Sequence, residues 1–269
     1  MHPSAASDLH EGFRDPQRVP AEDLVRFLEE ADRLPGIRAI QRAMRRALPL
    51  RPGMRLLDAG CGIGLEAARL AWEHPETVVT GLDRNAELLE IARRRIHPPP
   101  ANLRWLEGDL TKLELPEASF DAIRTERVLM YLPDGEFRRV LDDLVGLLRT
   151  GGRLALFELD YGATMLAPGG AGDAVVERAD EALFASLPQP LAGRHIPGLL
   201  SERGLRYVEA APFSFAVSEP VWRRIVADTL TVGGPPSPEV STWLRERSAA
   251  AARGEFVAAF TGVLTTGVR

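Results

Sequence analysis

The residue pattern best suited to chemistry is a glycine-rich turn directly after a short apolar run. The run ends at Asp58, and Gly60, Gly62 and Gly64 follow it at alternate positions. Glycines at this spacing let the backbone turn tightly and present its N–H groups to a ligand. A dinucleotide-binding turn would carry Gly or Ala where this chain has Leu65. The carboxylate of Asp58 therefore favours a cationic, amino-bearing ligand over a pyrophosphate.

Three more acidic residues stand where predicted strands end. Asp83 comes 19 residues after Gly64, where a carboxylate can accept both hydroxyls of a ribose. Asp109 follows the next predicted strand, and Glu126 follows the one after that. Each feature alone, the glycine turn included, is also compatible with a structural turn, a solvated loop or a helix cap. Four acidic residues at successive strand ends instead favour one ligand site at the carboxyl edge of a parallel sheet.

The elements that position these residues alternate between short buried strands and amphipathic helices. This alternation implies right-handed crossovers and a mostly parallel sheet covered by helices on both faces. Before it, residues 1–20 lack any period and predict a loose arm, whereas residues 21–48 carry two helical apolar stripes. The predicted strands are 55–58, 77–82, 103–106, 120–124, 153–159, 205–210 and 256–266, and the predicted helices between and after them are 65–72, 86–96, 136–148, 173–187, 195–203, 219–232 and 239–252.

Composition excludes several other kinds of chemistry. The 33 basic residues are 32 arginines and Lys112, and the chain has one cysteine, Cys61, and five histidines. One cysteine cannot form a disulfide within the chain, and no Cys/His spacing predicts a metal site. Lys112 lies in no phosphate-binding loop.

Charge and hydropathy narrow the partners. No apolar run approaches the roughly 18 residues of a membrane span, and the N-terminus lacks the pattern of a secretory signal. A formal net charge of -5 argues weakly against nucleic acid as a partner. We therefore expect a cytoplasmic protein, monomeric or homodimeric, that uses no metal and binds neither membrane nor nucleic acid.

Together these motifs make the chain resemble the class I S-adenosylmethionine-dependent methyltransferases. The similar members act on small molecules and include ubiquinone/menaquinone-biosynthesis methyltransferases and bacterial natural-product enzymes. The resemblance covers residues 35–160 closely and 190–212 loosely. It is carried by the turn 58–64, Asp83, Gly108-Asp109-Leu110 and the stretches 120–134 and 147–154.

The resemblance implies an architecture and a division of the chain. The fold class is α/β, with a Rossmann-like, seven-stranded, mostly parallel sheet whose last strand is antiparallel. Residues 1–50 would form an N-terminal arm and helical cover, and residues 51–269 would form the methyltransferase domain. Within that domain we expect a lid insertion at about 161–200 and helices at about 219–252.

The resemblance also implies a cofactor, S-adenosylmethionine, which leaves as S-adenosylhomocysteine. The glycine turn would meet its methionyl part, with Asp58 near its amino group. Asp83 would bind the ribose, with Arg84 beside the adenine, and Asp109 would contact the adenine edge. The expected cofactor-binding residues are Asp58, Gly60, Cys61, Gly62, Gly64, Asp83, Arg84, Gly108, Asp109, Leu110 and Thr125.

Methyl transfer from a sulfonium is an in-line displacement, so positioning and desolvation are its main catalytic contributions. A general base is needed only for a weak nucleophile such as a hydroxyl. The candidates for this base are His195, Glu126, Asp160 and Tyr161, and His10 joins them if the arm closes over the site. The candidates for acceptor binding are Arg127, Met130, Tyr131, Met165, Phe184, Phe215 and Trp222, with Arg194 as a second partner for an anionic group; most of these apolar residues are equally suited to the core.

The sequence does not decide the acceptor, which is either a secondary metabolite or a quinone-like compound. It also does not decide whether the methylated atom is oxygen, nitrogen or carbon. The Asn/Asp-Pro-Pro-Tyr/Phe turn of amino-methylating enzymes is absent after the fourth strand, where residues 124–127 read Arg-Thr-Glu-Arg. Two alternatives remain: a methyltransferase-fold binding protein without turnover, and a methyltransferase acting on RNA or protein. The complete glycine turn argues against the first, and the acidic net charge argues against the second.

Overall fold

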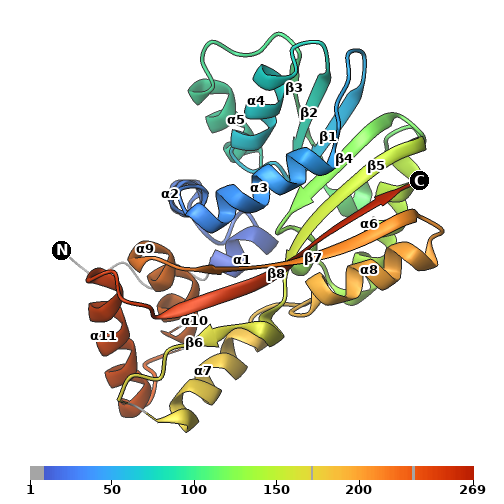
Figure 1. Ribbon diagram of the computed structural model, residues 1–269. Helices are drawn as coiled ribbons and strands as arrows, with labels where there is room; N and C mark the ends of the chain where they lie inside the picture. The colour runs from blue at the N-terminus through green and yellow to red at the C-terminus, as the bar shows by residue number, and fades with distance from the viewer. Residues whose placement is uncertain (1–8, 171, 232–233) are drawn as a thin grey trace.

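A twisted sheet forms the centre of the protein in a computed structural model that describes residues 9–170, 172–231 and 234–269 (Figure 1). The strand order is β3-β2-β1-β4-β5-β8, and β6 and β7 also pair with β8. β1 to β5 are parallel, and β8 is antiparallel to both β5 and β7. This confirms the predicted mostly parallel α/β sheet with an antiparallel last strand. The strands are β1 (Arg55–Ala59), β2 (Val78–Asp83), β3 (Leu103–Glu107), β4 (Phe120–Glu126), β5 (Leu148–Leu159), β6 (Met165–Leu166), β7 (Arg206–Ala216) and β8 (Ala258–Val268).

The described sheet has one strand more than the seven predicted. Met165 and Leu166 of β6 pair antiparallel with Ala259 and Ala258 of β8. Ala259 also pairs with Ala216 of β7, so β6 must lie on the other edge of β8, the edge that β5 uses further along. The seven longer strands therefore fill the predicted positions, and β6 only prolongs the β5 side.

Helices cover both faces of the sheet (Figure 1). α4 (Leu65–Glu73) and α5 (Ala86–Arg95) follow β1 and β2, whereas α6 (Asp134–Leu147) and α8 (Ala192–Glu202) follow β4 and β5. Because crossovers between parallel strands are right-handed and these two pairs lead in opposite directions from β1, they lie on opposite faces. α8 is thus a crossover helix on the sheet, and the lid insertion predicted for about 161–200 cannot extend into it.

The N-terminal cover comprises α1 (Leu9–Arg14), α2 (Ala21–Asp32) and α3 (Pro35–Ala47). α2 and α3 are amphipathic helices and confirm the two helical apolar stripes predicted over residues 21–48. α1 corrects the prediction of a loose arm over residues 1–20, because Leu9 and His10 are buried. Residues 1–8 of that arm lie outside the described residues.

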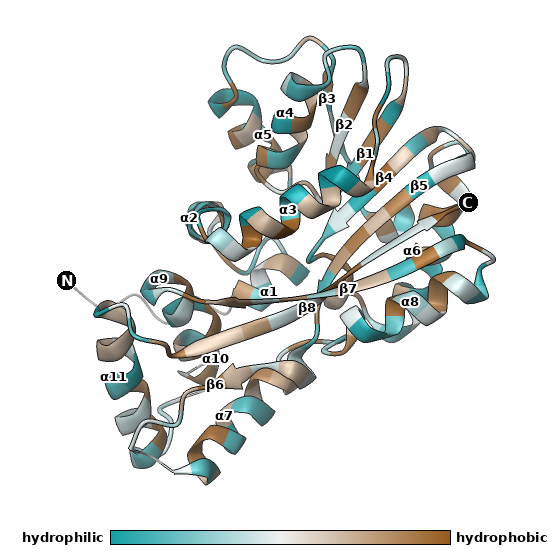
Figure 2. Ribbon diagram, in the orientation of Figure 1, coloured by the Kyte–Doolittle hydropathy of each residue, from teal (hydrophilic) through white to brown (hydrophobic). Residues whose placement is uncertain are grey.

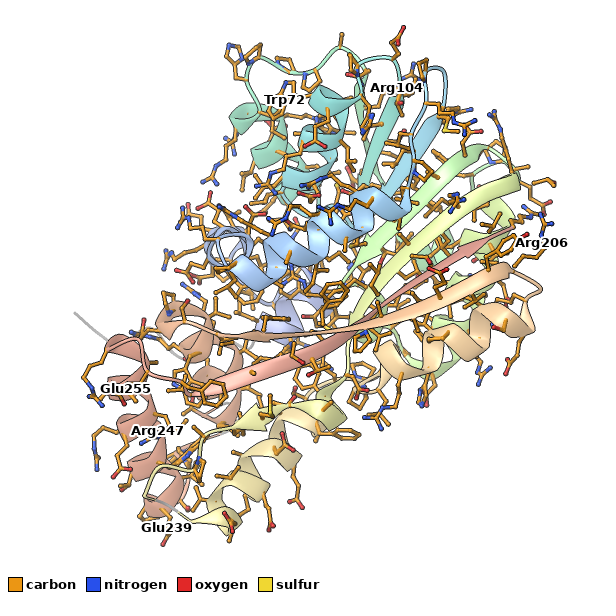
Figure 3. The ribbon with its side chains drawn as sticks, in the orientation of Figure 1. Trp72, Arg104, Arg206, Glu239, Arg247 and Glu255 are labelled. Carbon is orange, nitrogen blue, oxygen red and sulfur yellow. The ribbon has the colours of Figure 1, made fainter. Side chains whose placement is uncertain are left out.

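A second group of helices lies at the far end of β7 and β8 (Figure 1). Its core contains Trp222 and Trp243, whose ring centroids are 5.5 Å apart. Glu239, Arg247 and Glu255 project at its outer end (Figure 3). The helix predicted for 219–232 is three consecutive pieces in the described part, and the middle piece is a π-helix. The members are α7 (Asp173–Ala185), α9 (Glu219–Trp222), the π-helix Arg223–Ala227, α10 (Asp228–Thr231) and α11 (Pro238–Ala252).

The central strands are hydrophobic along most of their length, and the helices carry hydrophilic residues on their outer sides (Figure 2). Leu56, Leu57 and Ile123 are fully buried, as expected for parallel strands covered on both faces. None of the described helices combines the length and the apolar character that a membrane crossing requires. Within the described ranges, no three His, Cys, Asp or Glu side chains are grouped to hold a metal ion.

Candidate active site

A cavity lies between the carboxyl ends of β1 to β4 and the N-terminal cover, and its empty volume, mouth included, is about 1250 Å³. We divide its lining into two walls by position in the chain. The strand-end wall consists of Gly60, Gly62, Leu82, Asp83, Arg84, Asn85, Leu88, Gly108, Asp109, Leu110, Glu126, Arg127, Val128, Met130, Tyr131 and Leu132. The cover wall consists of His10, Gly12, Phe13, Pro16, Leu24, Phe27, Leu28, Ala31, Leu34, Ile37, Leu159, Tyr161, Phe215, Val221, Ile225 and Phe260.

The glycine turn needs glycine for two physical reasons. Gly60, Gly62 and Gly64 have φ values of 76°, 55° and 71°, in the left-handed region that L side chains disfavour. A Cβ at Gly60 would also stand 2.4 Å from a methyl group of Val128. The N–H groups of Gly60 and Cys61 both donate to the carbonyl of Leu82 at 2.8 Å. These bonds fix the turn against β2 and leave its glycine surface facing the cavity.

Asp83 and Asp109 are held in place before any ligand arrives. The carboxylate of Asp83 accepts from the N–H of Gly62 at 2.7 Å and from that of Asn85 at 2.9 Å. Burial raises the pKa of Asp83, although these two N–H groups oppose the shift. Asp109 accepts from the N–H and the hydroxyl of Thr111 at 2.8 and 2.9 Å. Both carboxylates line the cavity, and each keeps further lone pairs for donors such as hydroxyls or amines.

Asp58 requires a correction. It does not line the cavity but forms a buried ion pair with Arg124 of β4 at 3.0 Å. Arg124 also donates to Glu126 at 2.7 Å, and Glu126 accepts from Arg127 at 3.0 Å. Burial raises the pKa of Asp58 to about 6 even though Arg124 acts against the shift. The partner of Asp58 in the structure is thus Arg124, and the expectation that its side chain lies at the cavity surface is wrong.

Of the other residues predicted to bind the cofactor, some line the cavity and some do not. Cys61, Gly64 and Thr125 are not among the residues that line the cavity. Burial raises the pKa of the Cys61 thiol well above its ordinary value, with Asp83 and Asp58 adding to the shift. The residues that do reach the cavity are Gly60, Gly62, Asp83, Arg84, Gly108, Asp109 and Leu110.

Two of the four candidate bases lie away from the cavity. His195 is exposed on the outer side of α8. Asp160 is buried outside the lining and forms a bidentate ion pair with Arg194 at 2.6 and 2.8 Å. This pair also removes Arg194 as a partner for an anionic ligand. Glu126 lines the cavity, but two arginines already occupy its carboxylate.

Tyr161 is the candidate base whose side chain reaches the cavity without a hydrogen-bond partner in the protein. It lines the cavity, is 2% exposed, and its hydroxyl has no hydrogen-bond partner. Burial raises the pKa of Tyr161 well above its ordinary value, so the hydroxyl stays protonated and is unsuited to act as a base.

The acceptor-binding predictions are also split. Arg127, Met130, Tyr131 and Phe215 line the cavity. The remaining three do not, for opposite reasons. Met165 and Phe184 are exposed on the outside of the protein, at 52% and 37%. Trp222 is fully buried against Trp243 in the C-terminal helical group. In the segment 161–191, only Tyr161 among the described residues lines the cavity, so α7 does not act as a lid there.

Glu158 is a positioning residue that the sequence reasoning missed. Its buried carboxylate accepts from the N–H groups of Val128 and Leu129 at 2.9 Å and of Met130 at 3.2 Å. Burial raises its pKa to about 7 against the influence of these donors. Glu158 thereby fixes the loop that carries Met130 and Tyr131 into the cavity. The signal available was an acidic residue inside an otherwise apolar predicted strand.

Comparison with known proteins shows which family the sheet and the strand-end wall resemble. Residues 56–152 match the family model described as a methyltransferase domain. Residues 56–152 are therefore similar to a methyltransferase domain. Phosphoethanolamine N-methyltransferase 2 of Haemonchus contortus, solved with phosphomonomethylethanolamine and S-adenosylhomocysteine, shares this fold, with a TM-score of 0.61 and 17% identity over 97% of this chain and 60% of that one.

Two curated methyltransferases are similar in sequence. The 27-O-demethylrifamycin SV methyltransferase of Amycolatopsis mediterranei is 34% identical over 177 residues, which are 65% of this chain and 58% of that protein. Trans-aconitate 2-methyltransferase of Deinococcus radiodurans is 33% identical over 149 residues, which are 55% of this chain and 47% of that protein. The chain spans about half the length of the curated relatives that it matches first.

Proposed function

We propose that the protein binds S-adenosylmethionine along the strand-end wall and transfers its methyl group to a small molecule held against the cover wall. The observation that carries this proposal is the convergence of Gly60, Asp83 and Asp109, from three successive strand ends, on one cavity roofed by apolar helices. The methyltransferase match spans the whole strand-end wall.

The residues present fit this cofactor. The turn at Gly60 and Gly62 has no side chain to obstruct an approaching methionyl group, and a Cβ at either position would meet Val128 or Leu28. Asp83 and Asp109 keep lone pairs beyond their contacts within the protein, and in the proposed complex Asp83 would accept from ribose hydroxyls and Asp109 from the adenine amine. The cofactor supplies a methyl group that is already activated by its sulfonium. The protein therefore needs to hold the acceptor in line and exclude water, which can lower a barrier by about 7–11 kcal/mol.

The helical roof over the cavity favours a small acceptor over a macromolecule. α1 to α3 roof the site, and Phe13, Phe27 and Ile37 contribute apolar surface from this roof. The two named relatives are designated as methyltransferases of demethylrifamycin SV and of trans-aconitate. A secondary metabolite or quinone-like compound with an O-, N- or C-nucleophile is the acceptor that we propose.

Calorimetry with S-adenosylmethionine and S-adenosylhomocysteine tests the proposal. We expect micromolar-range binding by the wild type and a loss of at least thirtyfold in Asp83→Ala, because charge-assisted hydrogen bonds are worth about 2 kcal/mol or more. Glu107→Ala is the matched control, since Glu107 pairs with Asp83 in the β2–β3 register but is exposed and off the cavity. Absence of wild-type binding would refute the proposal.

A further inference from the structure

Within the part of the chain that the structure describes, the cover wall carries no charged side chain and is apolar over most of its surface. Among its described residues there is no Asp, Glu, Lys or Arg. Its polar side chains are His10 and Tyr161, and the rest of the wall is apolar or glycine. A ligand seated there exchanges water for hydrocarbon and aromatic surface, which favours an apolar molecule.

The charged residues of the opposite wall do not offer a free cation to an anionic ligand. Arg127 donates to Glu126 at 3.0 Å, and Glu126 is held in turn by Arg124. Arg84 donates to the carbonyl oxygen of Phe13 at 2.6 Å. These are the arginines among the described lining residues, and each has at least one partner, although Nε of Arg127 is buried without one. A carboxylate or phosphate entering the cavity would compete with Glu126 for Arg127 and with the carbonyl of Phe13 for Arg84.

Tyr161 brings to this wall a buried hydroxyl that has no hydrogen-bond partner. Several described residues have a buried hydroxyl without a partner, but of these only Tyr161 lines the cavity. Its ring is fixed by edge contacts with Phe260 and His10, with centroids 5.5 and 6.3 Å away. A buried hydroxyl without a partner is costly, so a ligand atom that accepts from it gains affinity and a fixed position.

The C-terminal helical group contributes part of the cover wall, and this part limits the shape of a ligand that can bind. Val221 and Ile225 line the cavity and flank or belong to the π-helix Arg223–Ala227. Short π-helical segments are rare and occur often at functional sites. Here Ile225 of the π-helix and Val221 of the preceding α9 present aliphatic side chains to the cavity.

We infer that the acceptor of the proposed reaction is an uncharged, largely apolar molecule bearing a hydroxyl or carbonyl oxygen, and that Tyr161 is its specificity-determining hydrogen-bond donor. This inference rests on the proposed function for the identity of the reaction. It assigns Tyr161 a binding role in place of a proton-accepting one. The protonated state of its hydroxyl at neutral pH agrees with donation.

Equilibrium dialysis with three matched probes tests the inference on protein loaded with S-adenosylhomocysteine and on unloaded protein. We expect 2-naphthol to bind and 2-naphthoate to bind at least tenfold more weakly. In Tyr161→Phe, the affinity for 2-naphthol should fall about two- to tenfold, the range for one neutral hydrogen bond. The affinity for 2-methylnaphthalene should not change in this variant, because it has no oxygen.

Two controls separate binding from stability. Tyr207→Phe removes the hydroxyl of a tyrosine that is 76% exposed and should change no affinity. Tyr161→Phe should melt at the same temperature as the wild type or higher, because it removes an unpaired buried hydroxyl; a purely structural role would lower the melting temperature instead. Undetectable 2-naphthol binding, equal or tighter 2-naphthoate binding, or unchanged 2-naphthol affinity in Tyr161→Phe would each overturn the inference. Failure to bind S-adenosylhomocysteine would instead refute the proposed function, since the unloaded protein still reports on the probes.

Discussion

The two walls of the cavity are built by different means. The strand-end wall lies entirely within residues 56–152, the segment that matches the methyltransferase domain, whereas the cover wall lies entirely outside it. The first wall uses backbone turns and fixed carboxylates such as Asp83 and Asp109. The second uses apolar side chains that segments distant in the chain bring together. We therefore expect cofactor binding, in the proposed function, to be specified by local sequence, and acceptor binding to be specified by packing.

The largest expected effect tests the ion pair behind the strand-end wall. Arg124→Met should lower the free energy of unfolding by about 3–5 kcal/mol, because Asp58 and Glu126 would lose their buried partner. Arg149→Met is the control, since Arg149 forms an ion pair with Asp121 at an exposed position and should cost less than about 1 kcal/mol. Urea denaturation measures both. Equal losses in the two variants would show that burial of the pair adds nothing.

The next prediction tests whether the glycine turn depends on the backbone conformation of Gly60 and on its close approach to Val128. Gly60→Ala should cost about 2–4 kcal/mol, because the new methyl group meets Val128 and the backbone has φ 76°. It should also weaken S-adenosylhomocysteine at least tenfold. Gly53→Ala provides the comparison: its φ is 80°, but nothing lies within 4 Å of the added Cβ. If both variants bound and unfolded alike, the close approach of Val128 would have no role.

A smaller effect concerns the carboxylate that holds the loop between the walls. Glu158→Gln should cost about 1–3 kcal/mol, because an amide N–H₂ cannot accept from the N–H of Met130. Folding raises the pKa of Glu158 from 4.5 to about 7, so the native state binds more protons than the unfolded state in this range. The stability that Glu158 contributes is therefore complete below pH 4.5 and is lost as the pH rises through 7.

The variant should lack that component of the pH dependence. Unfolding free energies of both proteins between pH 4.5 and 8 measure it. The wild type should lose more stability over this range than Glu158→Gln does, and a shallower slope should persist in the variant because Asp58 also has a raised pKa. Parallel curves would contradict the assignment.

The smallest effect tests the independence of the walls. Ile225→Ala removes aliphatic surface from the cover wall only and should weaken 2-naphthol by about fivefold, or about 1 kcal/mol. S-adenosylhomocysteine affinity should stay within twofold of the wild type. A comparable loss for both ligands would mean that the two walls cannot be treated separately.

The sequence predicted well what short local patterns encode. The mostly parallel, helix-covered sheet follows from the alternation of short buried strands and amphipathic helices. Asp83 and Asp109 were expected at the edge of the sheet because each follows its strand, and both line the cavity. Asp58 was misassigned for a physical reason: its partner Arg124 is 66 residues away and becomes its neighbour only through the β1–β4 register. A strand register is a property of the assembled sheet.

The cover wall was predicted poorly because hydrophobic character does not say which surface a side chain joins. Met165, Phe184 and Trp222 have the right residue types for an apolar pocket but face solvent or another core. α1 was missed because six residues are too few to display a helical period. Its burial comes from contacts with α2 and the loop after β4, which the sequence does not reveal.

The hydrogen bond from Arg84 to the carbonyl of Phe13 joins the two walls across the cavity. In the proposed function Arg84 lies on the cofactor side, and Phe13 is in α1, which roofs the acceptor side. Movement of α1 away from the sheet must break this bond, and it opens the compartments of both ligands at once. We therefore expect release of the spent cofactor and exchange of the methylated product to follow the same kinetic step, so that turnover is paced by motion of a six-residue helix rather than by the displacement itself.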